Sequence, residues 1–224
     1  MSLEIIKTSD GSDSLLNVEL NETYHSTHGA IQESAHVFIN AGLRYLLTKK
    51  NLPKFNILEI GFGTGLNAAL TGQVLQDTPH VVQYTSVEAY PLSEEIWGAL
   101  NYGSRLQAGE FFRKLHEAPW ETSVQLGRNF TLLKRKITLQ QLTLAAGQHH
   151  LVYFDAFSPN KQPEMWTIEM LEKITLSLHP GGIFVTYCAK GQLKRDLKKL
   201  GLIVESLPGP PGKMEMVRAI KPEI

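Results

Sequence analysis

The stretch ILEIGFGTG at residues 57–65 is an apolar run that leads directly into closely spaced glycines. A buried strand followed by such a turn lets the backbone approach a bound molecule, because glycine accepts positive φ angles at little steric cost. Dinucleotide-binding turns follow the pattern G-x-G-x-x-G/A, whose last residue must be small so that helix and strand can pack. The sixth position here is Leu66, so the turn departs from that pattern.

On both sides of this turn, the sequence predicts strands alternating with helices. We expect strands at 56–60, 81–88, 150–155, 183–188, 202–207 and 214–220, a hairpin at 124–132, and helices at 34–50, 66–75, 93–102, 105–116, 164–178 and 192–200. This alternation predicts an α/β fold with a mainly parallel sheet and helices on both faces. Residues 1–23 are expected to form a loop or a short edge hairpin. We therefore divide the chain into an N-terminal extension or lid, 1–50, and a Rossmann-like domain, 51–224.

The composition is that of an ordinary globular protein. The 22 basic and 22 acidic residues balance, so no global positive field indicates a nucleic-acid partner. No apolar run is long enough to cross a membrane, and the N-terminus lacks the pattern of a secretory signal. The single cysteine, Cys188, excludes an internal disulfide and is expected to be structural. We expect a cytoplasmic monomer.

Carboxylates stand at the ends of two predicted strands. Glu88 ends the strand that follows the glycine turn, and Asp155 ends a later strand just before a Ser-Pro turn. Ligands of doubly wound sheets lie beyond the carboxyl ends of the strands. Glu88 is therefore placed to accept hydrogen bonds from ribose hydroxyls, and Asp155 is predicted to face the reaction pocket. The structural alternatives are an exposed strand-end acid and a turn-initiating aspartate.

The glycine turn resembles that of S-adenosylmethionine (SAM) methyltransferases, and further motifs resemble one family of them. The chain is similar over nearly its whole length to the methyltransferase domain of the bacterial MnmC family, which takes part in the biosynthesis of 5-methylaminomethyl-2-thiouridine in tRNA. The resemblance is carried by YHSTHG (24–29) with Glu33, ILEIGFGTGLN (57–67), SVEAYPL (86–92), DAFSPNKQPEMW (155–166), GGIFVTYCAKG (181–191) and GPPGKMEMVRA (209–219).

The resemblance implies a class I SAM-dependent methyltransferase that methylates the aminomethyl nitrogen of the tRNA wobble uridine. It implies a methionine-side turn formed by Gly61, Gly63 and Gly65, a ribose contact from Glu88, a carboxylate, Asp155, beside the methyl group, and a lid carrying Tyr24 and Glu33. Many such enzymes bind adenine with a Gly-Asp pair. This chain has KRKIT at 134–138 instead, so backbone groups are expected to take that part.

Side chains for RNA are expected around the same pocket. Phe157 and Trp166 are candidates for stacking on a splayed base, although either can equally be a core aromatic. Lys213 and the basic group at 190–199 are candidates for phosphate contacts, with a solvated helix face as the alternative. The HSTH pattern at 25–28, with His36, superficially resembles a metal site, but no fourth ligand has the usual spacing, so we expect no metal.

Two other functions fit parts of the pattern. An aminopropyltransferase of the spermidine synthase type has a similar sheet but is expected to carry a second aspartate soon after Asp155, and residues 156–159 contain none. A non-catalytic RNA-binding module is disfavoured by the glycine turn occurring together with Glu88 and Asp155. The length also leaves no room for a second, flavin-dependent domain, so we expect activity on tRNA that already carries the free aminomethyl group.

Overall fold

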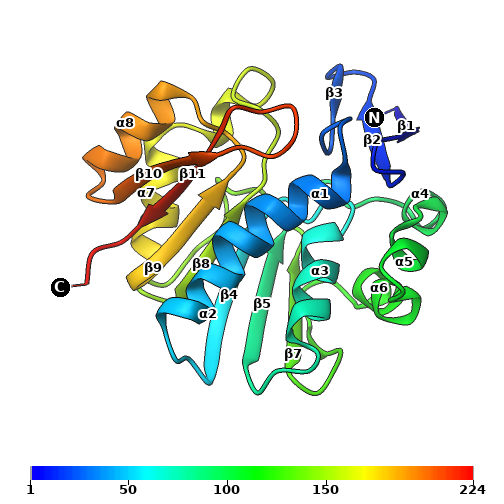
Figure 1. The fold of residues 1–224 in the computed structure, drawn as a ribbon, viewed down its shortest axis with the longest axis horizontal. Coiled ribbons are helices and arrows are strands. Elements are labelled where there is room, and N and C mark those ends of the chain that lie inside the picture. Colours follow the sequence, from blue (N-terminus) through cyan, green and yellow to red (C-terminus); the bar gives the residue numbers. More distant parts are fainter. Residues whose placement is uncertain (1, 224) are drawn as a thin grey trace.

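An eight-stranded sheet with the order β10-β11-β9-β8-β4-β5-β7-β6 forms the centre of this computed structural model, which describes residues 2–223 (Figure 1). The pairs β4–β5, β4–β8, β5–β7 and β8–β9 are parallel, and strands at both edges are antiparallel. The parallel strands are β4 (Lys54–Ile60), β5 (Val81–Val87), β7 (Phe130–Arg135), β8 (His149–Phe154) and β9 (Leu178–Thr186). The antiparallel ones are β6 (Ser123–Gln125), β10 (Ile203–Pro208) and β11 (Glu215–Ile220).

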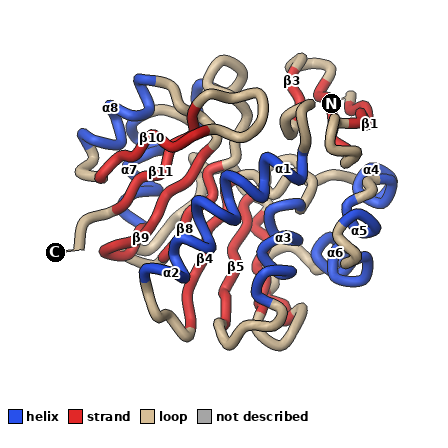
Figure 2. Tube along the Cα trace, viewed as in Figure 1, coloured by secondary structure: helices blue, strands red, loops and turns tan. Residues whose placement is uncertain are grey.

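Two apolar cores cover the two faces of this sheet. Alternate residues of β4 enter different cores: Phe55 and Ile57 belong to one, Leu58 and Ile60 to the other. The first face carries α1 (Ala30–Ser34), the π-helix η1 (Ala35–Arg44), α2 (Tyr45–Lys49) and α3 (Leu66–Leu75); the second carries α7 (Ile168–Ser177) and α8 (Gly191–Lys199) (Figure 2). This is the predicted α/β fold with helices on both faces.

The helix expected at 34–50 is longer at its N-terminus. α1, η1 and α2 follow one another without a break from Ala30 to Lys49. Gly29, which precedes α1, has no side chain to cap it. Instead Asp10 accepts a hydrogen bond from the backbone N of Gln32 at 3.0 Å. The cap thus comes from a distant part of the chain.

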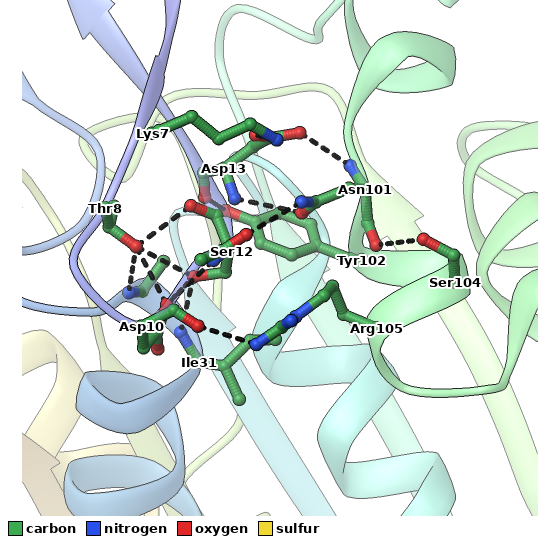
Figure 3. Close-up of polar contacts among 12 residues, drawn as sticks. Lys7, Thr8, Asp10, Ser12, Asp13, Ile31, Asn101, Tyr102, Ser104 and Arg105 are labelled. Carbon is green, nitrogen blue, oxygen red and sulfur yellow. Dashed lines mark hydrogen bonds and ion pairs between the residues drawn. The ribbon is translucent and has the colours of Figure 1, made fainter.

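The N-terminal residues form more than the expected loop or hairpin. β1 (Leu3–Lys7), β2 (Asp13–Asn17) and β3 (Glu22–Thr23) make a separate antiparallel sheet with the order β1-β2-β3. Figure 3 shows how it is attached: Asp13 and Asn101 exchange hydrogen bonds of 2.9 and 2.8 Å, and Arg105 donates to the carbonyl of Asp10. The small sheet is therefore fixed to the segment that follows β5.

Several expected helices are divided. The region 93–117 contains α4 (Glu94–Ala99), α5 (Tyr102–Arg105) and α6 (Gly109–Glu117), and the last break coincides with Gln107, whose φ is 52°. The helix expected at 164–178 is a 3-10 turn, η2 (Pro163–Met165), followed by α7, which Thr167 caps through Met170 N. In the described part of the chain no helix is both long and apolar enough to cross a membrane.

Candidate active site

A cavity of about 910 Å³ lies at the carboxyl ends of β4, β5 and β8. The turn after β4 and the residues that follow β5 and β8 line it, together with parts of segment 22–28 and loop 137–140. This is the edge at which open α/β sheets bind ligands. Ligand pockets commonly enclose about 300–1,000 Å³, so the cavity has room for a nucleoside cofactor and a further reacting group.

Glycine stands at each of the three positions of the turn for a different structural reason. Gly61 has a φ of 93°, and a Cβ there would lie 2.5 Å from the carbonyl oxygen of Asp155. Gly63 has a φ of 49°, and its Cβ would lie 3.2 Å from the ring of Tyr24. Gly65, with a φ of 73°, lies outside the cavity lining and starts α3. The turn thus lets β4, β8 and the N-terminal segment meet closely beneath the cavity.

Glu88 directly follows β5 and lines the cavity. Its Oε2 accepts a hydrogen bond from Gly63 N at 3.0 Å, and its Oε1 accepts one from Tyr90 N at 2.9 Å. These bonds orient the carboxylate, and each oxygen retains a second lone pair for another donor. The arrangement suits a vicinal diol such as that of a ribose.

Asp155 directly follows β8 and is half-buried in the cavity lining. Its backbone N donates to the carbonyl of Ile60 at 2.9 Å, which fixes it next to the glycine turn. Asn67 donates its Nδ2 to the Asp155 Oδ2 at 2.8 Å. Burial raises the pKa of Asp155 to about 7, against the opposing effect of the Asn67 hydrogen bond. The carboxyl can therefore exchange a proton near neutral pH.

Two segments, 23–28 and 209–214, which we call the roof, are joined over one side of the cavity. Glu33, almost fully buried, accepts from Ser26 N at 2.7 Å through Oε2 and pairs with Lys213 Nζ at 2.5 Å through Oε1. The Lys213 ammonium also lies 3.8 Å from the ring centroid of Tyr187. Glu33 and Lys213 were predicted to contact cofactor and RNA; both line the cavity, and here each is engaged in holding the roof together.

The aromatic residues predicted for stacking lie in different surroundings. Phe157 lines the cavity, and its ring meets that of Tyr24 edge to face at a centroid distance of 5.0 Å. Trp166 does not line it: the side chain is buried against Phe154 and donates Nε1 to the carbonyl of Phe157 at 2.8 Å. Of the two roles that the sequence left open for Trp166, these surroundings are those of a core aromatic that supports the Phe157 loop.

The region expected to bind adenine has an inward-pointing lysine. Lys134 is buried, donates to the carbonyl of His116 at 2.6 Å, and lies over the rings of Trp120 and Phe62 at 4.7 and 5.3 Å. Burial lowers its pKa to about 8. The cavity is lined instead by the following residues, 137–140. The carbonyls of Thr138, Leu139 and Gln140 accept hydrogen bonds from within the chain.

Sequence reasoning missed the roles of two residues. Asn67, in the second position of α3, connects the glycine turn to Asp155; its position in the quoted motif ILEIGFGTGLN was the available signal. His25 places Nε2 at 2.7 Å from Thr64 Oγ1 and so holds the roof to the turn. Burial lowers the pKa of His25 to about 4, so its ring is neutral at pH 7.

Among the described residues no group of three or more His, Cys, Asp or Glu side chains gathers as metal ligands would.

Comparisons with known proteins agree with this geometry. The family model described as S-adenosyl-L-methionine-dependent methyltransferase matches residues 116–222. A Cupriavidus necator protein, tRNA 5-methylaminomethyl-2-thiouridine biosynthesis bifunctional protein MnmC, is 29% identical over 216 residues, which cover 91% of this chain and 32% of that protein. The protein of the same name from Pseudomonas savastanoi pv. phaseolicola is 30% identical over 214 residues, which cover 89% and 32%. The chain thus spans about a third of the length of these relatives.

Solved structures show the same fold. The crystal structure of MNMC2 from Aquifex aeolicus is 27% identical with a TM-score of 0.79, and the match covers 100% of this chain and 73% of that one. Spermidine synthase from Thermotoga maritima, at 12% identity and a TM-score of 0.58 over 100% of this chain and 81% of that one, shares the fold alone.

Fold and cavity together define a class I methyltransferase that uses SAM. Within that class, the chain is similar to the bifunctional MnmC proteins over about a third of their length and to the MNMC2 structure over 73% of that chain.

Proposed function

We propose that this chain N-methylates the 5-aminomethyl group of the wobble uridine in tRNA, giving 5-methylaminomethyl-(2-thio)uridine. The observation that carries the proposal is the half-buried Asp155 in the cavity lining, oriented by Asn67 and with a pKa near 7. The names of the MnmC relatives support this substrate. Residues 1–50 are proposed to act as the lid and 51–224 as the methyltransferase domain.

The residues of the cavity fit the cofactor. Glu88 is proposed to hold the ribose hydroxyls, and the turn at 61–65 is proposed to hold the methionine side. A Cβ added at Gly61 would clash with the Asp155 carbonyl oxygen, and one at Gly63 would press on the Tyr24 ring. Bound SAM supplies an electrophilic methyl group on a sulfonium.

The task of the protein is to deliver the amine with a free lone pair. A primary alkylammonium has a pKa of about 10, as for lysine, and is protonated at pH 7. Asp155 is proposed to accept a proton from this ammonium, so that the nitrogen lone pair becomes available while the new N–C bond forms and the S–C bond breaks. Phe157 is proposed to contact the uracil base, and the cavity walls to align the amine.

The pH dependence follows from the raised pKa of Asp155. The carboxyl must be ionised to accept a proton, so the single-turnover rate should rise as the pH increases through about 7 and level off above it. Replacing Asp155 with Asn keeps the shape and should lower the rate by about 100-fold or more, within the range attributed to general bases. SAM affinity, measured by calorimetry, should change much less.

The decisive measurement is nucleoside mass spectrometry of tRNA incubated with the pure protein and SAM. Aminomethyl tRNA should gain one methyl group on the side-chain nitrogen, and carboxymethylaminomethyl tRNA should not react, because its added carboxylate is repelled by Asp155. Transfer of an aminopropyl group from decarboxylated SAM would favour the spermidine synthase alternative. SAM binding without turnover on any tRNA form would favour an RNA-binding module.

A further inference from the structure

A second acid lies beneath the cavity, out of reach of solvent. Glu59 is the penultimate residue of β4, and its exposed fraction is 0%. Its Oε2 accepts a hydrogen bond from Ser86 Oγ, on the neighbouring strand β5, at 2.5 Å. An ionised carboxylate in such a place is costly unless several donors surround it. Ser86 supplies one.

The remaining polar atoms around Glu59 lack partners. Three side-chain atoms of this cluster are buried without a hydrogen bond among the described residues: Glu59 Oε1, Asn67 Oδ1 and the Tyr84 hydroxyl. Asn67 and Tyr84 both lie close enough to act on Glu59 through side-chain hydrogen bonds. A carboxylate offers acceptors alone, whereas a carboxylic acid also offers an O–H donor. The Tyr84 hydroxyl can donate to only one of the two acceptor oxygens, Glu59 Oε1 and Asn67 Oδ1, so a proton on Glu59 supplies the second donor that this group needs.

The charges around the cluster act in the same direction. Asp155, whose Oδ2 is bound to Asn67, lies near enough for its negative charge to oppose ionisation of Glu59. Burial is the largest cause, and with the charge of Asp155 it raises the pKa of Glu59 to about 8, against the lowering effect of the hydrogen bonds with Ser86, Tyr84 and Asn67. The other titratable groups that face Glu59 are the neutral phenols of Tyr84 and Tyr153, while Glu33 and Lys213 face Asp155.

We propose that Glu59 is a positioning residue that works in its neutral, protonated form and holds the Asn67 amide in the orientation that donates to Asp155. The role of Asp155 rests on the proposed function. The chain of contacts runs from Ser86 through Glu59 and Asn67 to Asp155, and Asn67 is the one member that touches both acids. Glu59 thereby fixes which oxygen of Asp155 is left for the amine.

The protonation state can be tested without any substrate. Infrared spectroscopy of the full chain with isotope-labelled glutamate, which keeps the signal of the partly protonated Asp155 out of the edited spectrum, should show at pH 7 the carbonyl stretch of a buried protonated glutamic acid. This band should vanish in Glu59→Gln. A spectrum at pH 7 in which Glu59→Gln removes a carboxylate band instead would overturn the proposal. This readout stays valid even if tRNA methylation proves to be absent.

The positioning role is tested by rescue with a conservative variant. Glu59→Leu removes the donor and leaves Asn67 unsupported, so the single-turnover rate should fall by about 10–100-fold, the equivalent of one unsatisfied buried group. Glu59→Gln carries an N–H donor and should recover most of that loss. Because a neutral Glu59 contributes no charge, Gln should leave the acidic limb of the pH–rate profile unmoved. SAM affinity should stay within about threefold in both variants.

Two outcomes would refute this role. If Glu59 is ionised in the working enzyme, Gln should be as impaired as Leu, or should shift the acidic limb to lower pH by removing a negative charge near Asp155. Glu172→Gln, an exposed acid on α7, is the matched control and should change neither rate nor profile. If Glu59→Leu does not fold, the Gln profile and the infrared band decide the question.

Discussion

Gly61 holds the end of β4 against the end of β8. Its φ of 93° and the 2.5 Å from a built Cβ to the Asp155 carbonyl oxygen mean that any side chain at this position must displace the backbone of Asp155. We expect Gly61→Ala to destabilise the fold by about 1–3 kcal/mol, the cost of a strained backbone position, and to reduce methyl transfer further by displacing Asp155. Denaturant unfolding and single-turnover rates measure the two effects.

Two other glycines serve as controls that separate the cost of backbone strain from the effect of displacing Asp155. Gly147 also has a positive φ, 67°, but its Cβ would meet nothing within 4 Å, so Gly147→Ala should cost stability while sparing the rate. Gly98 lies in α4 with open space around it, so Gly98→Ala should stabilise slightly. Equal rates for Gly61→Ala and Gly147→Ala would argue against a role for Gly61 in placing Asp155.

The positions of the cavity residues Gly61, Glu88 and Asp155 could be predicted from the sequence because each directly follows a strand. An apolar run that ends in glycine or an acid locates Gly61, Glu88 and Asp155 at one edge of a parallel sheet, whatever the side chains around them. Partnerships between distant segments were not readable. Glu33 and Lys213 are 180 positions apart in the chain, and nothing local indicates that they pair.

The roof lines the cavity and is held together by contacts between distant segments. The Glu33–Lys213 pair joins segments 23–28 and 209–214, and His36 Nε2 adds a contact of 2.8 Å to the carbonyl of Pro208. Lys213→Met should leave the buried Glu33 carboxylate without its cation. We expect a loss of about 3 kcal/mol in stability, as for a buried pair that loses one partner, and faster dissociation of SAM.

Lys194 offers a matched control for that substitution. Its ion pair with Glu215 has the same 2.5 Å separation but its acid is 48% exposed, against 6% for Glu33. Lys194→Met should therefore cost about 1 kcal/mol or less. Unfolding in denaturant and stopped-flow release of SAM compare the two variants, and equal effects would mean that the roof pair is an ordinary surface contact.

The ends of the helices were harder to predict from the sequence than the positions of the strands. Thr167 caps α7 from within its own sequence, so the start of that helix had a local signal. The first helix has none: Gly29 offers no side chain, and Asp10 reaches Gln32 from another segment. The expected start at residue 34 was therefore too late, since the stabilising group is visible only once the chain is folded.

At the scale of the whole molecule, a net charge of zero conceals an uneven surface. Many basic groups between residues 190 and 221 have carboxylate partners within the chain: Lys194 with Glu215, Lys199 with Asp196, Lys213 with Glu33, and Arg218 with Glu205. Lys221 donates to backbone carbonyls. Among the described residues, Lys190, Arg195 and Lys198 have no carboxylate partner and remain for phosphates.

These three groups set the expected salt dependence of tRNA binding. Each phosphate contact contributes about −0.7 to −0.9 to the slope of log K against log salt, so we expect a total slope of about −2 to −3. Arg195→Gln and Lys198→Gln should each reduce its magnitude by about 0.7–0.9. Lys54→Gln is the control, because Lys54 begins β4 at the end of the sheet opposite the cavity. Filter binding of aminomethyl tRNA between 50 and 300 mM salt, roughly the range over which counterion release is measured, gives the slopes. A slope near zero would show that this basic region is a solvated face, and an equal loss for Lys54→Gln would mean that tRNA binds without regard to the cavity.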